Sequence, residues 1–387
     1  MSEIADVLAA IEALSANGER MALATVVAVR GSTYRRPGAR LLIPEHGAPI
    51  GNISGGCLEG DVADVGRIVM DEGTPRLATW DLTAEDDAVW GLGLGCNGAI
   101  EVYIEPAREA GAVAGALHRA IGEARPICLV TVIRSSNAKV PSGARLLWDP
   151  SAPESPESPR SLESSESPES PGSLGDAAVD VAARAAAADQ STQERSAVRE
   201  LGPDVQAFVE VLEPPLHLVV CGAGHDAVPL VHAAAVLGWR IDVVDERAAF
   251  LSRERFPDAS GFVLLGEPEE VGQLGTVTER TFAVVMTHRY ERDLGYLEGL
   301  SRSPARYIGA LGPAARTERM LHDLSARGVA TDAFRARLHG PAGLDLGSEG
   351  PEEIAQSILA EIIAVKRGRD GAPQRARPGP IHDRQAR

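Results

Sequence analysis

Apolar side chains recur at helical spacing at the start of the chain and then give way to patterns typical of strands. The helical positions are Ile4, Val7, Leu8, Ile11 and Leu14. They predict an amphipathic helix over residues 2–16. Aliphatic runs broken by glycine and proline follow, "MALATVVAVRGS" and "GARLLIPEHGAPIGNI", and predict an antiparallel hairpin or meander. Helical spacing returns in "DVADVGRIVMDEG", and "RLATWDL" and "IEVYIEP" predict further strands.

The same order of patterns occurs twice. Residues 128–148 restate residues 22–43, with "GARLL" reproduced, and "FVEVLEP" (208–214) restates "IEVYIEP" (100–106). These landmarks predict an internal duplication with copies over about 20–106 and 127–214, the alternative being chance likeness between two β-rich segments. The second copy has "GSLGD" where the first has "SGGC", so only the first copy keeps a cysteine in its glycine loop.

Another pattern begins after the second copy. "HLVVCGAGHDAVPLVHAAAVLGWRIDVVDE" reads as strand, glycine turn, helix and second strand, which is the dinucleotide-binding fingerprint in its required context. "GFVLLG", "FAVVMTH" and "RYIGALG" predict more buried parallel strands. The sequence therefore predicts an α/β protein. A β-rich α+β domain with an internal duplication (1–214) precedes a Rossmann-like parallel-sheet domain (215–368).

Two segments lack any hydrophobic period. Residues 151–172 are rich in Ser, Pro and Glu and predict a disordered insertion, and the polar residues 369–387 predict a flexible tail.

Charge and cysteine content narrow the class of protein. With 38 Lys and Arg against 55 Asp and Glu, the net charge of −17 argues against nucleic acid as a partner. The sequence contains no apolar run long enough to span a membrane, and its first residues are acidic. We therefore expect a cytoplasmic protein without membrane contact. The four cysteines form no CxxC pair and are expected to stay reduced.

The predicted Rossmann domain contains one group of candidate ligand contacts. Gly222 permits the tight turn and Gly224 lets backbone N–H groups approach a pyrophosphate, with His225 in the same turn. Asp245 ends the second strand, where a carboxylate accepts a ribose hydroxyl. A domain of this type that binds no nucleotide remains the alternative. His288, which follows a strand, and Asp345, in "HGPAGLDLG", are further candidates, each with a purely structural role as its alternative.

The loop "GNISGGCLEGDV" contains the second group of candidates. Gly55 and Gly56 predict a nest of backbone N–H groups for an anion, and Arg35, Arg36 and Arg40 precede it. A thiolate at Cys57 near arginines would be stabilised and nucleophilic. Cys96, in "WGLGLGCNG", has similar surroundings. Either cysteine could instead be a small core residue.

Eight stretches, taken together, resemble the XdhC/CoxI family, the accessory proteins of molybdenum hydroxylases. They are "GSTYRRPGARLLI", "GNISGGCLEGDV", "GLGLGCNG", "EVLEPP", "HLVVCGAGH", "YIGALG", "GPAGLDLG" and "PEEIAQSILAEIIAV". The family's Ser-Arg-Arg after "YIGALG" is replaced here by Pro313, Ala314 and Ala315, and its "GCGG" by "GCNG" with Asn97.

The resemblance implies a chaperone that binds molybdenum cofactor, as molybdopterin or its dinucleotide form. It further implies sulfuration with a cysteine desulfurase and insertion into an apo-hydroxylase. Cys57 and Cys96 would then be the reactive residues, with Cys57 in contact with the metal. A homodimer is the default assembly. Two alternatives stay open, an NAD-dependent oxidoreductase and a scaffold with an empty Rossmann domain. The hydroxylase enzyme itself is excluded, because four scattered cysteines cannot hold two iron–sulfur clusters.

Overall fold

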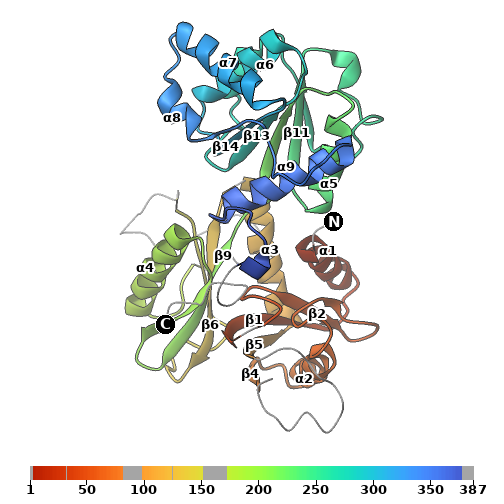
Figure 1. Ribbon diagram of the computed structural model, residues 1–387. Coiled ribbons are helices and arrows are strands. Elements are labelled where there is room, and N and C mark those ends of the chain that lie inside the picture. Colours follow the sequence, from red (N-terminus) through yellow and green to blue (C-terminus); the bar gives the residue numbers. More distant parts are fainter. Residues whose placement is uncertain (1–2, 32, 82–97, 124, 151–171, 377–387) are drawn as a thin grey trace. The chain divides into compact units, whose positions relative to one another are not determined.

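The computed structural model describes residues 3–31, 33–81, 98–123, 125–150 and 172–376 (Figure 1). Cys96 and nearly all of the predicted disordered insertion lie outside these residues. The chain divides between Pro214 and Pro215 into two compact units, which are described separately below. Among the described residues, no helix combines the length and apolar character needed to cross a membrane.

The first copy of the repeat forms an antiparallel sheet with the strand order β3-β2-β1-β5-β4. Its strands are β1 (Met21–Gly31), β2 (Arg40–Pro44), β3 (Ile50–Gly51), β4 (Arg76–Asp81) and β5 (Gly98–Pro106). Helix α2 (Glu59–Glu72) buries Val62, Ala63 and Val69 against this sheet.

The second copy forms an antiparallel sheet with the order β7-β6-β9-β8. Its strands are β6 (Ile127–Ser135), β7 (Arg145–Trp148), β8 (Ala197–Gly202) and β9 (Val205–Leu212). Helix α4 (Ala177–Gln193) packs on it, and the Asp176 carboxylate caps the helix by accepting from the backbone N–H groups of Ala178 and Val179. The two sheets therefore have corresponding strand orders, as a duplication requires.

Strand register fixes which residues of the two copies correspond. Thr25 lies opposite Tyr103, and Thr131 lies opposite Phe208. In both central strand pairs the register shifts directly after this threonine pair, following Val26 in the first copy and Val132 in the second. Glu105 of β5 thus corresponds to Glu210 of β9. The alignment of "IEVYIEP" with "FVEVLEP" is wrong in register, because it equates Glu105 with Glu213.

Two further helices complete this unit. Helices α1 (Glu3–Ala16) and α3 (Ala107–Glu123) share a core with the central strands of both copies, through residues such as Val7, Leu117 and Leu129. A smaller core joins the two sheets directly and consists of Val27 and Tyr103 from the first copy and Ile133 and Phe208 from the second.

The second unit is a six-stranded parallel sheet in the order β12-β11-β10-β13-β14-β15. Its strands are β10 (His217–Cys221), β11 (Arg240–Asp245), β12 (Gly261–Leu264), β13 (Thr281–Val285), β14 (Tyr307–Ala310) and β15 (Leu338–His339). The order reverses between β10 and β13, so the loops after these two strands flank the point where ligands of such sheets bind. The prediction of a Rossmann-like domain is confirmed.

Helices cover both faces of this sheet (Figure 1). They are α5 (Ala227–Val236), α6 (Tyr290–Ser301), α7 (Ala314–Ala326), α8 (Thr331–Arg335) and α9 (Pro351–Lys366), with short 3-10 turns at Ala248–Phe250, Pro268–Gln273 and Gln374–Ala376. Helices α5 and α9 bury Leu230 and Ile358 on one face. Helices α6 and α7 bury Leu297 and Leu324 on the other. Strands buried on both faces explain the continuous apolar runs in the sequence.

Candidate functional site

Cys57 is exposed and lies two residues before the first residue of helix α2. The other cysteines that the structure describes, Cys128 and Cys221, are buried within strands. Burial raises the pKa of the Cys128 thiol to about 12, and burial also raises the pKa of Cys221. Neither buried thiol is therefore a nucleophile at neutral pH, and both act as small core residues.

The loop around Cys57 is tied to the carboxylate of Glu59. That carboxylate accepts hydrogen bonds from the backbone N–H groups of Ile53 (3.1 Å), Ser54 (2.9 Å), Gly56 (2.9 Å) and Leu58 (3.2 Å). The Ser54 hydroxyl also donates to Glu59, at 2.5 Å. The Gly55 N–H donates to the Asn52 side chain at 2.9 Å. Partial burial acts to raise the pKa of Glu59, but the hydrogen bonds from Ser54 and from the backbone outweigh it and lower this pKa.

The converging N–H groups predicted at Gly55 and Gly56 therefore exist, but the chain's own carboxylate fills the nest they form. Both glycines have the positive φ that such a loop requires, +86° and +107°. The expectation that these N–H groups bind an external anion is corrected, because Glu59 and Asn52 already accept from them. The arrangement instead holds the Cys57 thiol on an ordered loop at the surface.

The second copy keeps the anchoring and lacks the thiol. Asp180 of α4 accepts from the Ser173 hydroxyl and from the Leu174 N–H, both at 2.6 Å. Leu174 is buried in the core of the second copy, as Leu58 is in that of the first. A carboxylate from the following helix thus fixes the loop in both copies, and only the first presents a cysteine.

The three predicted arginines have different surroundings. Arg36 is exposed and Arg35 is half-buried, whereas the Arg40 side chain is only 4% exposed. Arg40 donates to Glu210 of the other copy at 2.5 Å. Its counterpart Arg145 donates in the same way to Glu105, whose pKa is raised by burial against the opposing effect of Arg145. We therefore remove Arg40 from the candidate ligand contacts, because its guanidinium binds the other repeat.

Gly222 and Gly224 make the predicted turn after β10, and only Gly222 is required by the fold. Gly222 has φ +115°, and a Cβ atom there would lie 2.9 Å from the Thr287 nitrogen in the loop after β13. A Cβ atom on Gly224 would meet nothing within 4 Å. Among the described residues, no hydrogen bond uses the N–H groups of Gly224, His225 or Asp226. These groups are available to an anion at the start of α5.

Asp245 ends β11 as predicted, but its carboxylate is fully buried and occupied. It accepts from the Ala223 N–H at 2.7 Å and from the Arg247 N–H at 2.9 Å. The Arg247 side chain donates to it through Nε at 2.8 Å and through a terminal nitrogen at 2.7 Å. Burial raises the pKa of Asp245, but these bonds outweigh burial and lower it. In this conformation Asp245 supports the glycine turn and has no free oxygen for a ribose hydroxyl.

His288 lies at the carboxyl edge of the sheet, as predicted. It follows β13 and pairs with Asp226, which follows β10, at the point where the strand order reverses. Its Nε2 atom lies 2.9 Å from the Asp226 carboxylate in the glycine turn. His288 has φ +61°, a conformation uncommon for a residue with a side chain. Asp226 escaped the sequence analysis because the fingerprint leaves its position unspecified. His225 is exposed.

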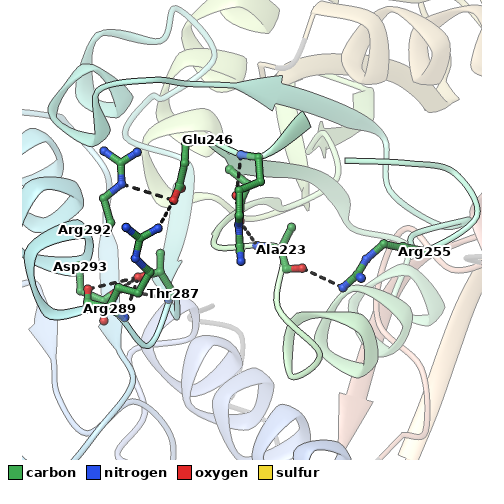
Figure 2. A network of polar contacts seen from close by, with 9 residues as sticks. Ala223, Glu246, Arg255, Thr287, Arg289, Arg292 and Asp293 are labelled. Atoms are coloured by element: carbon green, nitrogen blue, oxygen red, sulfur yellow. Dashed lines mark hydrogen bonds and ion pairs between the residues drawn. The ribbon is translucent and has the colours of Figure 1, made fainter. Parts of the chain in front are cut away.

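Carboxylates and arginines line the same edge of the sheet (Figure 2). Glu246 lies between Arg289 (2.5 Å) and Arg292 (3.4 Å). Arg255 donates to the Ala223 carbonyl at 3.0 Å. The buried Asp293 accepts from the Thr287 N–H at 3.0 Å and pairs with Arg316 at 2.8 Å. Together these contacts fix the loops that follow β10, β11 and β13.

Asp345 is exposed in a loop that follows β15. The Gly343 N–H donates to Glu361 of α9 at 2.8 Å, and the Ser357 hydroxyl donates to the Leu344 carbonyl at 2.5 Å. The loop lines a shallow cavity of about 470 Å³ together with Ile354. Among the described residues, no three His, Cys, Asp or Glu side chains gather in a way that could hold a metal ion.

A duplicated antiparallel unit followed by a Rossmann unit, with a thiol exposed on the first, defines a distinct class of two-unit protein. Comparison with known proteins identifies this class. Residues 14–81 match the XdhC and CoxI family, and residues 218–362 match the XdhC Rossmann domain. A probable xanthine dehydrogenase subunit of Bacillus subtilis (strain 168) is 32% identical over 364 residues, which cover 92% of this chain and 96% of that protein. The chain belongs to the XdhC and CoxI family, and the resemblance seen in its sequence is confirmed.

Two further relatives span most of the chain. The "Molybdenum cofactor insertion chaperone PaoD" of Escherichia coli (strain K12) is 23% identical over 361 residues, covering 92% of this chain and 86% of that protein. A crystal structure described as a xanthine dehydrogenase from Bacillus halodurans matches with a TM-score of 0.68 and 27% identity, covering 96% of this chain and 98% of that one.

Proposed function

We propose that this chain is an accessory factor in the maturation of molybdenum cofactor, which it binds as cargo and delivers to a molybdenum hydroxylase apo-enzyme. The observation that carries the proposal is the exposed Cys57 thiol on a loop ordered by Glu59. A surface thiol held in this way suits contact with a soft metal or its sulfur ligand. The relative named as a molybdenum cofactor insertion chaperone supports this choice of cargo.

The finer steps of the proposal concern sulfur and the nucleotide. We assign to Cys57 contact with the molybdenum centre while a cysteine desulfurase supplies the terminal sulfur. The free N–H groups at Gly224 and His225 are assigned to the phosphate of the cofactor or to the pyrophosphate of its dinucleotide form. Cys96, Arg35, Arg36 and Asp345 remain candidate contacts within this proposal, and a homodimer remains the proposed assembly.

Nicotinamide-dependent oxidation is the weaker candidate. It would use the Rossmann unit to hold NAD, with Asp245 on the ribose. The occupied and fully buried Asp245 carboxylate does not favour that use. Hydride transfer would not require the Cys57 thiol. Replacing this cysteine therefore distinguishes the maturation function from the oxidoreductase function.

The test compares Cys57→Ser with wild type for bound molybdenum, bound pterin and activation of an apo-hydroxylase. We expect Cys57→Ser to fold like wild type, because an exposed loop cysteine contributes little packing, but to retain less cofactor and to activate poorly. Cys128→Ala, which removes a buried thiol, is the control and should keep both properties. Wild-type levels of cofactor and activation in Cys57→Ser would remove the thiol from the function. Turnover of NAD by the wild-type protein without bound pterin would favour the oxidoreductase.

A further inference from the structure

Tyr34 is the one aromatic side chain among the described residues that is largely exposed, at 68%. It precedes β2 in the segment that follows β1, on the first copy of the repeat. Aromatic rings usually bury most of their surface in the core, as Tyr103 and Tyr307 do here at 2% and 0% exposure. An exposed ring on its own needs no explanation, so the position of this one decides whether it has a role.

The Tyr34 ring lies against the loop that presents the thiol. A Cβ atom built on Gly55 would lie 3.1 Å from Tyr34 Cδ1 and within 3.5 Å of two further ring atoms. Gly55 also has φ +86°, which disfavours any residue with a side chain. The bare glycine therefore lets the ring approach the backbone two residues before Cys57, and leaves most of the ring's surface open.

Five backbone N–H groups of this loop are used within the protein. Glu59 accepts from the N–H groups of Ile53, Ser54, Gly56 and Leu58, and Asn52 accepts from that of Gly55. A ligand that reaches Cys57 finds few backbone groups to bind, but it does find an aromatic surface. The exposed ring therefore offers a flat apolar surface for recognition beside the thiol.

We propose that Tyr34 is a binding residue that stacks on a planar nitrogen heterocycle whose metal or sulfur end reaches Cys57. The inference rests on the proposed function, under which that heterocycle is the pterin of the cofactor. Stacking on a tyrosine ring selects flat rings of any substitution pattern, and the thiol adds selectivity for a soft atom. Glu59 contributes by keeping the glycine backbone in the conformation on which the ring rests.

The experiment titrates the full chain with unsubstituted pterin and follows the loss of pterin fluorescence. Tyr34→Leu keeps an apolar side chain but removes the flat ring, and should weaken pterin binding about tenfold. Tyr34→Phe keeps the ring and should bind like wild type. Gly55→Ala, which displaces the ring, should weaken binding as Tyr34→Leu does.

Two outcomes would overturn the inference. The first is no pterin binding by wild type, and the second is equal binding by wild type and Tyr34→Leu. If Tyr34→Leu in that second case also fails to activate a hydroxylase, Tyr34 is a contact for the partner protein. The proposed function fails separately, if wild type purified from cells that make the cofactor holds no molybdenum while its Tyr34-dependent pterin binding persists.

Discussion

Single carboxylates decide the conformation of both candidate regions. Glu59 gathers N–H groups of the cysteine loop, and Asp245 ties the Ala223 N–H of the glycine turn to Arg247. Glu59 occupies the place that sequence reasoning gave to an external anion. Asp245 is bound within the protein, whereas sequence reasoning expected it to accept from a ribose hydroxyl. These carboxylate oxygens are already hydrogen-bonded within the protein. They therefore affect ligand binding by ordering the backbone and not by direct contact.

Removing the Glu59 carboxylate should release the cysteine loop. In Glu59→Ala the amides of Ile53, Ser54 and Gly56 lose their acceptor, so their hydrogen exchange should accelerate while the amides of β1 keep their protection. The Leu58 N–H also donates to the Ser54 hydroxyl at 2.8 Å and should respond less. The measurement is amide exchange followed by mass spectrometry or NMR. Asp61→Ala, in the same helical turn, is the matched control and should leave the loop unchanged. Unchanged exchange in Glu59→Ala would show that the loop is ordered by other contacts.

The two glycines of the Rossmann turn should respond differently to alanine. Gly222→Ala combines a φ of +115° with a Cβ atom 2.9 Å from the Thr287 nitrogen, and should destabilise the protein by about 2 kcal/mol or more. Gly224→Ala has neither problem and should leave the denaturation midpoint unchanged. Chemical denaturation measures both, and similar losses for the two variants would contradict the geometry. If a phosphate approaches Gly224, cofactor retention should still fall in Gly224→Ala.

Asp242 should make stability depend on pH in acid. A hydrogen bond from His217 lowers the pKa of Asp242 against the opposing effect of burial, and Arg240 helps. A lowered pKa in the folded state means that the stabilisation is complete above the ordinary aspartate pKa of about 3.9 and is lost as the pH falls through the folded value. The stability gap between wild type and Asp242→Asn should therefore narrow progressively as the pH falls below about 5. A gap that stays constant would assign the difference to packing.

At the scale of elements, the reciprocal ion pairs between the repeats should contribute strongly to stability. Arg40 and Glu210 are 4% and 6% exposed, so Arg40→Met leaves a buried carboxylate without its partner and should cost about 3–5 kcal/mol. Arg76→Met removes an exposed pair with Glu72 and should change stability by less than about 1 kcal/mol. Urea denaturation measures both, and comparable effects would show that burial of the first pair is unimportant.

Most elements could be predicted from the sequence because their patterns are long and strongly periodic. The Rossmann half was found because strand, glycine turn and helix follow one another directly at β10 and α5. Helix α3 was not named in the sequence analysis, although its sequence is amphipathic and buries Val113, Leu117 and Ala120 on one face. The repeat register was misassigned because "EP" ends β5 but follows the end of β9 at Leu212. The pairing of Thr131 with Phe208 fixes the true correspondence.

The candidate site could be predicted only in part, because residue type does not reveal the partner of a charge. Cys57 was found exposed, and His288 was found at the sheet edge. The partner of Arg40 lies far along the chain in the other repeat, which no local pattern indicates. The acceptor in the glycine nest was missed because Glu59 resembles any acidic residue in the first turn of a helix.

At the scale of the whole molecule, each of the two units has its own hydrophobic cores. The two Rossmann cores contain residues from Leu216 onward, and the other four contain residues up to Leu212. Fragments 1–214 and 215–387 should therefore each fold when expressed alone, with circular dichroism and cooperative unfolding as the measurements. A fragment 215–387 that lacks cooperative unfolding would show that its cores depend on the other unit.

The two buried ion pairs between the repeats are related to each other by an approximate two-fold symmetry. Arg40 reaches Glu210 while Arg145 reaches Glu105, so one kind of contact is made twice with the roles of the two halves exchanged. A two-fold axis between identical protomers generates contacts of this kind. The two halves of this unit are therefore paired in the way that fusion of two copies of one domain into a single chain would produce.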